Sequence, residues 1–219
     1  MNKYNIIYAD PPWSFKTYSD KGKGKSPEQH YTCMTIDDIY NLPVNKIADD
    51  NAVLLLWVTF PLLQEGLETI KRWGFTYKTC AFNWFKRNKK ANSWFWGMGY
   101  YSRSNTELCL LATKGKTLYR ESKSIHQVVE TENPFKVIDD WLVYCHDTEF
   151  VASVIEKHSK KPNIARDRIV ELFGDLPRIE LFAREEYDGW DCMGYEINQK
   201  DIREELEEYI NKDSEDNGN

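Results

Sequence analysis

The chain has 219 residues, a formal net charge of −6 and a charged fraction of 29%. This length suits one compact domain with a substantial core. No apolar stretch approaches the roughly 20 residues that span a bilayer, so we expect a cytoplasmic protein with no membrane span. The negative charge is concentrated in residues 201–219, where eight acids and two bases give 2 − 8 = −6. Residues 1–200 are neutral overall, so the acidic balance does not exclude a polyanionic partner.

The five cysteines are scattered along the chain and form no CxxC pair, and the four histidines do not lie at ligand spacing beside them. They are Cys33, Cys80, Cys109, Cys145 and Cys192. This distribution favours reduced core thiols over a zinc site or a disulfide framework. We therefore expect no metal.

Strands and helices are predicted to alternate along the chain. Apolar runs predict strands over residues 4–10, 52–58, 75–85, 106–113, 178–183 and 190–197. Helices are predicted from a Thr35 cap to Tyr40 and over residues 61–73, 163–173 and 200–210, the last an acidic surface helix. The alternation predicts an α/β domain over residues 1–199 with a mainly parallel central sheet, followed by an acidic helix and flexible tail over 200–219.

The tetrad Asp10-Pro11-Pro12-Trp13 follows the first predicted strand. Ligands of open α/β sheets bind beyond the carboxyl ends of the strands, and two prolines stiffen the turn that presents the carboxylate. A carboxylate and backbone carbonyls suit the two N–H groups of an aromatic amine. A tryptophan can stack on the ring that carries this amine. The alternative is a proline-rich turn with a capping aspartate and a surface tryptophan.

Residues 84–105 form a basic and aromatic segment without a single acid. Its basic residues are Lys86, Arg87, Lys89, Lys90 and Arg103, and its aromatic residues include Trp84, Trp94, Phe95, Trp96, Tyr100 and Tyr101. Cations can follow phosphates and aromatic rings can stack on bases or enter a duplex, so the segment is a candidate nucleic-acid loop. The alternative is a solvated turn with some of its aromatics in the core.

Ordered motifs over about residues 4–197 resemble the MT-A70 family of S-adenosylmethionine-dependent adenine-N6 methyltransferases. They are DPPW, HYTCMTIDDIYNLPV, AVLLLWVT, WGFTYKTCAFNWFKRNKK, SRSNTELCLLATKGK, HSKKPNIARDRIVELFG, RIELFAR and GWDCMGYE. The resemblance implies a Rossmann-like methyltransferase fold with helices on both faces of the sheet. It also implies a permuted motif order, with the catalytic motif before the cofactor motif. The chain lacks a GxGxxG turn, which argues against a nicotinamide or flavin enzyme.

The resemblance also implies roles for individual residues. Asp10, Pro11, Pro12 and Trp13 would be catalytic. Lys161 resembles the lysine that pairs with the cofactor's carboxylate, Arg184 resembles the arginine that binds its ribose, and Glu196 is suited to the ribose hydroxyls. The remaining expected cofactor contacts are Ala9, Asp10, Phe182 and Tyr195, although many relatives have asparagine at the position of Tyr195.

For the nucleic acid, the resemblance implies Tyr31 as an aromatic gate and Glu107 as an acid near the target nucleotide. The other expected contacts are Lys16, Lys86, Arg87, Lys89, Lys90, Trp94, Trp96, Arg103 and Asn105. A segment at about 133–155 is longer than the family usually has, and could serve target recognition, an oligomer contact or neither. A homodimer or heterodimer is compatible with the resemblance.

The resulting hypothesis is an adenine-N6 methyltransferase that uses S-adenosylmethionine on DNA. The preference for DNA rests on resemblance to the bacterial and phage branch. The alternatives are methylation of RNA and a non-catalytic nucleic-acid-binding subunit. A cytosine-N4 methyltransferase is disfavoured by an aspartate rather than a serine at the first position of the tetrad.

Overall fold

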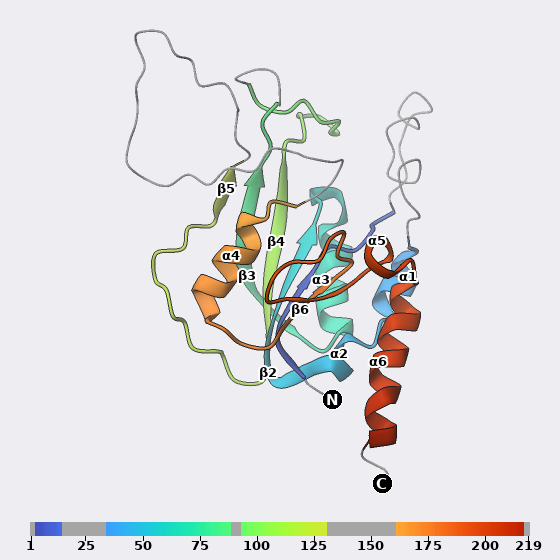
Figure 1. Ribbon diagram of the computed structural model, residues 1–219. Helices are drawn as coiled ribbons and strands as arrows, with labels where there is room; N and C mark the ends of the chain where they lie inside the picture. The colour runs from blue at the N-terminus through green and yellow to red at the C-terminus, as the bar shows by residue number, and fades with distance from the viewer. Residues whose placement is uncertain (1–2, 15–33, 89–92, 131–160, 217–219) are drawn as a thin grey trace.

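The computed structural model describes residues 3–14, 34–88, 93–130 and 161–216 (Figure 1). The strands are β1 (Tyr4–Ala9), β2 (Ala48–Val58), β3 (Thr76–Phe85), β4 (Thr106–Lys114), β5 (Val128–Glu130), β6 (Arg178–Leu181) and β7 (Asp191–Met193). The helices are α1 (Ile36–Tyr40), α2 (Val44–Ile47), the 3-10 turn η3 (Phe60–Leu62), α3 (Leu63–Arg72), α4 (Ile164–Phe173), α5 (Tyr195–Asn198) and α6 (Ile202–Asp216).

The seven strands form one sheet in the order β5-β3-β4-β2-β1-β6-β7. β1 pairs in parallel with β2 and β6, and β3–β5 and β6–β7 are also parallel. β4 pairs antiparallel with both β2 and β3, so of these seven strands it alone runs in the opposite direction. The expected mainly parallel sheet of a Rossmann-like fold is confirmed, with one reversed strand inside it.

Alternate residues of the central strands face two separate apolar layers, as expected of strands buried on both faces. Ile7 and Leu54 belong to the layer that packs on α1, α2, α3 and α6. Ile6 and Val53 belong to the layer that packs on α4. Helices therefore cover both faces of the sheet, which confirms the predicted α/β architecture.

The helix termini follow the local sequence closely. Thr35 caps α1 by accepting from the backbone N–H of Asp38 at 3.1 Å, and the Asp38 carboxylate in turn accepts from the Thr35 backbone N–H. This reciprocal pair is a capping box. At the end of α4, Gly174 adopts a φ of 80°, a conformation that favours glycine.

The last helix, α6, extends beyond the predicted residues 200–210 and packs on the core. Ile202 and Leu206 are buried in the layer beneath the sheet. Tyr209 stacks on Tyr4 of β1 with 5.8 Å between ring centroids. One side of this acidic helix is therefore part of the fold, which the expectation of a surface helix did not include.

The predicted strand over residues 190–197 is wrong in its second half. β7 ends at Met193, and the chain then forms α5 from Tyr195 to Asn198. Short apolar stretches do not distinguish a strand from a helical turn by periodicity. The predicted strand over 178–183 likewise ends at Leu181, because Phe182 leaves the extended region with a φ of 64°. The short elements α2 and β5 were not predicted.

The described residues contain no helix that is both long and apolar enough to cross a membrane. Within the same ranges, no group of three or more His, Cys, Asp or Glu side chains is arranged to hold a metal ion. Cys80, Cys109 and Cys192 are free thiols.

Candidate active site

The sheet register brings distant parts of the chain to one edge. Ala9 at the end of β1 pairs with Leu56 of β2 and Leu181 of β6, so Asp10 emerges beside the carboxyl ends of both strands. Because β4 runs in reverse, its first residues lie at this same edge, with Leu108 paired to Val58. Glu107 therefore reaches the edge from the start of its strand, whereas Asp10 reaches it from the end.

The proline turn is fixed by contacts on both sides. The backbone N–H of Trp13 donates to the carbonyl of Pro11 at 2.8 Å, and the N–H of Met34 donates to the carbonyl of Pro12 at 3.3 Å. The indole N–H of Trp13 donates to the carbonyl of Trp57 at 2.9 Å. These bonds hold the turn against the end of β2, so the direction of the Asp10 carboxylate is set by the fold.

Trp13 is only 5% exposed and belongs to the apolar core. Little of the indole ring is therefore exposed for the expected stacking on a base. A buried tryptophan with its N–H satisfied by Trp57 acts as a support for the turn. This burial corrects the surface-tryptophan alternative. The role of Trp13 in stacking on a base stays a prediction.

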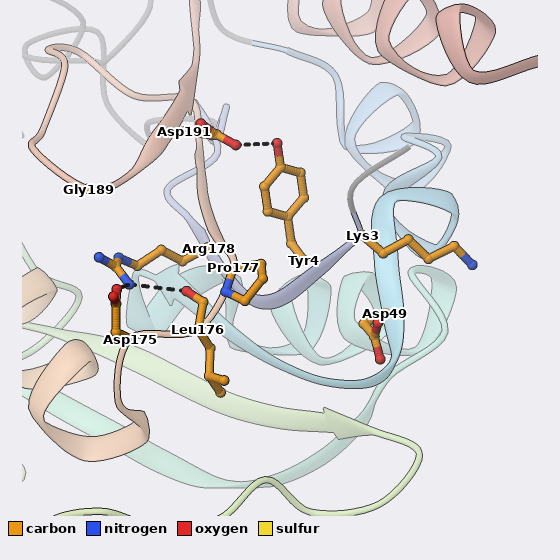
Figure 2. A pocket seen from close by; sticks show the side chains of 9 residues that line it. All are labelled: Lys3, Tyr4, Asp49, Asp175, Leu176, Pro177, Arg178, Gly189 and Asp191. Carbon is orange, nitrogen blue, oxygen red and sulfur yellow. Dashed lines mark hydrogen bonds and ion pairs between the residues drawn. The ribbon is translucent and has the colours of Figure 1, made fainter. Parts of the chain in front are cut away.

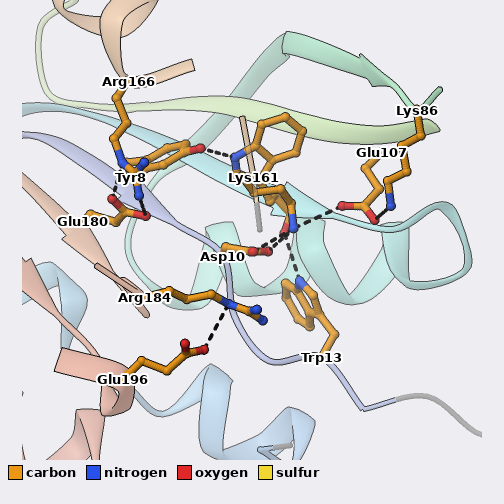
Figure 3. A network of polar contacts seen from close by, with 11 residues as sticks. Tyr8, Asp10, Trp13, Lys86, Glu107, Lys161, Arg166, Glu180, Arg184 and Glu196 are labelled. Atoms are coloured by element: carbon orange, nitrogen blue, oxygen red, sulfur yellow. Dashed lines mark hydrogen bonds and ion pairs between the residues drawn. The ribbon is translucent and has the colours of Figure 1, made fainter. Parts of the chain in front are cut away.

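Four charged side chains form a continuous chain of ion pairs at this edge (Figure 3). The Lys161 ammonium donates to both carboxylate oxygens of Asp10 at 2.7 Å. The same ammonium lies 3.1 Å from Oε2 of Glu107, and the Lys86 ammonium pairs with Oε1 of Glu107. The side chains of Asp10, Lys161 and Glu107 are 20%, 9% and 10% exposed. These charged groups are therefore recessed, and the two carboxylates are balanced by two ammonium groups.

The two carboxylates differ in acidity because of their surroundings. Burial raises the pKa of Asp10 and the neighbouring Glu107 raises it further, while the cation of Lys161 opposes both effects. Burial would also raise the pKa of Glu107, but Lys161 and Lys86 together outweigh it and lower that pKa to about 2. Burial alone would lower the pKa of Lys161, but both carboxylates act against it and raise the pKa. Asp10 is thus the more basic carboxylate of the pair, as a group that accepts from an amine should be.

A second polar pair lies beyond the end of β6. Nε of Arg184 is 3.4 Å from Oε1 of Glu196, and Figure 3 shows the Arg184 side chain between Asp10 and Glu196. Tyr195 beside this pair is 70% exposed. The segments that follow β6 and β7 pack closely here, since a Cβ on Gly194 would lie 2.3 Å from the carbonyl oxygen of Ala183. Together with the strained φ of Phe182, this packing fixes the direction of Arg184 and Glu196.

The predicted nucleic-acid residues separate into two groups. Lys86 and Glu107 belong to the buried ion pairs, and Asn105 accepts the backbone N–H of Lys86 at 2.8 Å. Arg87 lies over the ring of Trp94 at 3.5 Å and Arg103 over Trp96 at 5.0 Å, in the segment beyond β3 and β4. The expected contacts at Lys16, Tyr31, Lys89 and Lys90 and the 133–155 segment lie outside the described residues.

A buried Arg–Glu pair behind the site was not predicted. Arg166 of α4 donates to both carboxylate oxygens of Glu180 in β6, at 2.5 and 2.8 Å, and both side chains are buried. Asn163 accepts a further bond from this guanidinium at 2.8 Å. The signal was present in the sequence, because an acid in the middle of the apolar RIELFA strand requires a partner.

The hollow shown in Figure 2 lies at the opposite edge of the sheet, between the first residues of β1, β6 and β7. Its polar groups are largely paired with one another. Tyr4 donates to Asp191 at 2.6 Å, and Arg178 donates to Asp175 at 2.7 Å. This hollow is separate from the recessed carboxylates at the carboxyl edge.

Comparison with known proteins shows the family of this chain. Residues 4–196 match the MT-A70 family. The chain belongs to the MT-A70 family. This is a family of adenine-N6 methyltransferases that generally depend on S-adenosylmethionine, and the chain is accordingly a methyltransferase.

Individual relatives differ in how much of their length is matched. The Type II methyltransferase M.MunI of Mycoplasma sp is 30% identical over 216 residues, covering 91% of this chain and 80% of M.MunI. The N6-adenosine-methyltransferase non-catalytic subunit MTB of Arabidopsis thaliana is 32% identical over 136 residues, which are 59% of this chain and 17% of that protein. The catalytic subunit METTL3 of Homo sapiens is 24% identical over 185 residues, 84% of this chain and 26% of METTL3. The matches to the two N6-adenosine relatives therefore cover only 17% and 26% of their lengths.

Proposed function

We propose that this methyltransferase modifies the N6 amine of adenine in DNA. The observation that carries the proposal is the recessed carboxylate of Asp10, which burial makes more basic and which a rigid proline turn holds at the carboxyl edge of the sheet. A carboxylate in this position can accept a hydrogen bond from an exocyclic amine. That bond favours a more tetrahedral nitrogen with an available lone pair.

The chemistry of the surrounding groups fits S-adenosylmethionine. The cation of Lys161 suits the carboxylate of its methionine part, and Arg184 with Glu196 suits the hydroxyls of its ribose. Ala9, Phe182 and Tyr195 lie beside these groups in the chain and would complete the site. When bound, S-adenosylmethionine supplies an electrophilic methyl group on a sulfonium sulfur.

The residues of the chain then have distinct tasks. Asp10 orients the amine and receives a proton from the nitrogen, directly or through water. Lys161 would hold the carboxylate of the methyl donor in place of Asp10, which would free the Asp10 oxygens for the amine. Glu107 keeps Lys161 in place during this exchange, because it retains its own bond to the ammonium and a second cation from Lys86.

DNA is proposed as the substrate because M.MunI is matched over most of both chains, whereas the N6-adenosine relatives are matched over a small part of theirs. RNA methylation is the first alternative. The similarity to a non-catalytic subunit supports a second, a binding subunit of a larger complex. The ion pairs around Asp10 disfavour the second alternative, since a binding subunit has no need of a buried basic carboxylate.

Transfer of a labelled methyl group from S-adenosylmethionine to nucleic acid tests the proposal. The substrates are unmethylated duplex DNA of mixed sequence and RNA of the same sequence, with Asp10→Ala as the inactive control. We expect label on the DNA with the wild-type protein alone and none with the variant. Label only on RNA would contradict the DNA proposal. Cofactor binding without transfer to either polymer would support the binding-subunit alternative.

A further inference from the structure

The chain between β3 and β4 contains a short, tightly built hairpin over residues 93–105. Its two sides are joined by an antiparallel bridge between Gly97 and Ser104. A Cβ on Gly99 would lie 2.0 Å from the carbonyl oxygen of Ser102, so the backbone closes there in a turn that only glycine can form. The hairpin thus has a defined tip between Gly99 and Ser102.

Two tyrosines occupy this tip. Tyr100 is 80% exposed and Tyr101 is 96% exposed. Their rings meet edge to face, with centroids 4.8 Å apart. Single exposed apolar side chains are common, but here two adjacent aromatic rings are exposed together at the tip of a hairpin. They form a small aromatic surface that is almost fully accessible to solvent. By contrast, Trp84 at the base of the segment is fully packed in the core.

Two arginines, one in the hairpin and one just before it, lie against aromatic rings of the hairpin. Arg87 covers Trp94 and Arg103 covers Trp96, which orders two guanidinium groups near the stem. Residues 84–105 contain five basic side chains and no acid. This charge is complementary to a phosphate backbone and is unlike the mixed charge of a typical protein contact.

The hairpin is also directly connected to the recessed site. Lys86 leaves the end of β3, where its backbone N–H is bonded to Asn105 and its ammonium to Glu107. Glu107 in turn contacts Lys161, which holds Asp10. Because Asp10 is only 20% exposed, a base that remains stacked in a duplex cannot bring its amine to the carboxylate. The adenine must leave the stack to react.

We propose that the Tyr100–Tyr101 pair is a wedge that enters the duplex and fills the space left by the extruded adenine. The inference rests on the proposed function. It specifies that the DNA substrate is a duplex. Aromatic rings stack on bases of any sequence, so they can replace the lost stacking of the target base. The arginines beside the hairpin stem bind the flanking phosphates and position the tip. The recessed carboxylate then receives the extruded base.

The test compares two duplexes that contain a methylation site mapped on wild-type product. In one the target adenine is paired with thymine, and in the other it lies opposite an abasic site, where extrusion costs less. The variant is Tyr100→Ala/Tyr101→Ala. Tyr119→Ala is the matched control, because Tyr119 is 77% exposed but follows the far end of β4. Initial rates, the fluorescence of 2-aminopurine at the target position and the mass in solution are measured for each protein.

We expect the double variant to lose at least about tenfold in rate on the paired duplex and to retain the wild-type rate, within about twofold, on the abasic duplex. It should also lose the rise in 2-aminopurine fluorescence, while Tyr119→Ala behaves as the wild type. Equal losses on both duplexes, no loss on either, or a changed mass in solution that marks a subunit contact would each overturn the wedge. Wild-type protein that binds S-adenosylmethionine but yields no methylated DNA on which to map a site would contradict the proposed function itself, and the wedge with it.

Discussion

The ammonium of Lys161 lies 2.7 Å from both carboxylate oxygens of Asp10, although the two residues are 151 positions apart in the chain. The Lys161 cation opposes the rise that burial causes in the pKa of Asp10, and the pair directs the carboxylate to the carboxyl edge of the sheet. It also joins the expected ligand of the cofactor's carboxylate to the side chain that we propose to be catalytic. In the proposed function, binding of the methyl donor to Lys161 would release Asp10, and both events would depend on this one ammonium group.

Replacing Lys161 by methionine keeps the apolar stem and removes the charge. We expect the affinity for S-adenosylmethionine to fall at least about tenfold in calorimetric titration. The free energy of unfolding should fall by about 3 to 5 kcal/mol, because Asp10 is left as an unpaired buried charge. Lys200→Met, which removes a half-exposed lysine paired with Glu208, is the matched control. An unchanged affinity would show that Lys161 does not hold the cofactor.

The pH dependence of the free energy of unfolding should reveal the contribution of the Glu107 ion pairs. Its pKa of about 2 in the folded protein lies below the ordinary 4.5, so its ion pairs stabilise the fold above about pH 4.5 and are lost as the pH falls towards 2. Glu107→Gln removes this contribution, which is on the order of 3 kcal/mol at most. Urea unfolding at about pH 6 and about pH 3 should therefore show a smaller loss of stability in the variant than in the wild type. Glu186→Gln, on the exposed surface, controls for the chemical change. The same pH dependence in Glu107→Gln and wild type would refute the ion-pair interpretation.

The buried pair of Arg166 and Glu180 should be strongly coupled. Arg166→Met or Glu180→Gln alone is expected to cost about 3 to 5 kcal/mol of unfolding free energy, since each leaves a buried partner unsatisfied. The double variant should cost less than the sum of the two, as measured in a double-mutant cycle. Asp175→Asn removes the partner of Arg178, but Asp175 is 91% exposed and its loss should cost less than about 1 kcal/mol. Additive effects of Arg166→Met and Glu180→Gln would show that the pair is not coupled.

Gly194→Ala should damage the cofactor site through packing. The added methyl would lie 2.3 Å from the carbonyl oxygen and 2.7 Å from the nitrogen of Ala183. The backbone segments that lead to Arg184 and Glu196 must therefore shift. We expect weaker binding of S-adenosylmethionine, by at least about tenfold. Gly74→Ala is the control, because it is strained by a φ of 81° at the opposite edge and should reduce stability without changing this affinity. Equal affinities in the two variants would show that packing at Gly194 does not position Arg184 and Glu196.

The sequence predicts most of the architecture, because strand and helix patterns are local. The proline turn after β1, the Thr35 cap and the order of strands and helices all follow from residues that are neighbours in the chain. The meeting of Asp10 with Lys161 and Glu107 does not, since it depends on the strand order and on the reversed direction of β4. Composition also grouped Lys86 with the phosphate-binding residues, whereas its fixed position beside Asn105 directs it to Glu107. The burial of Trp13 depends on the carbonyl of Trp57, which no pattern near residue 13 reveals.

We propose above all that the Asp10 carboxylate activates the amine of adenine. Its most direct test is mass spectrometry of nucleosides from duplex DNA treated with wild-type protein, Asp10→Asn and Asp10→Ala, each shown by calorimetry to bind S-adenosylmethionine. We expect N6-methyladenine from the wild type, less from Asp10→Asn, which keeps one acceptor oxygen, and none from Asp10→Ala. Methylated cytosine as the product, or an undiminished yield of N6-methyladenine from Asp10→Ala, would contradict it.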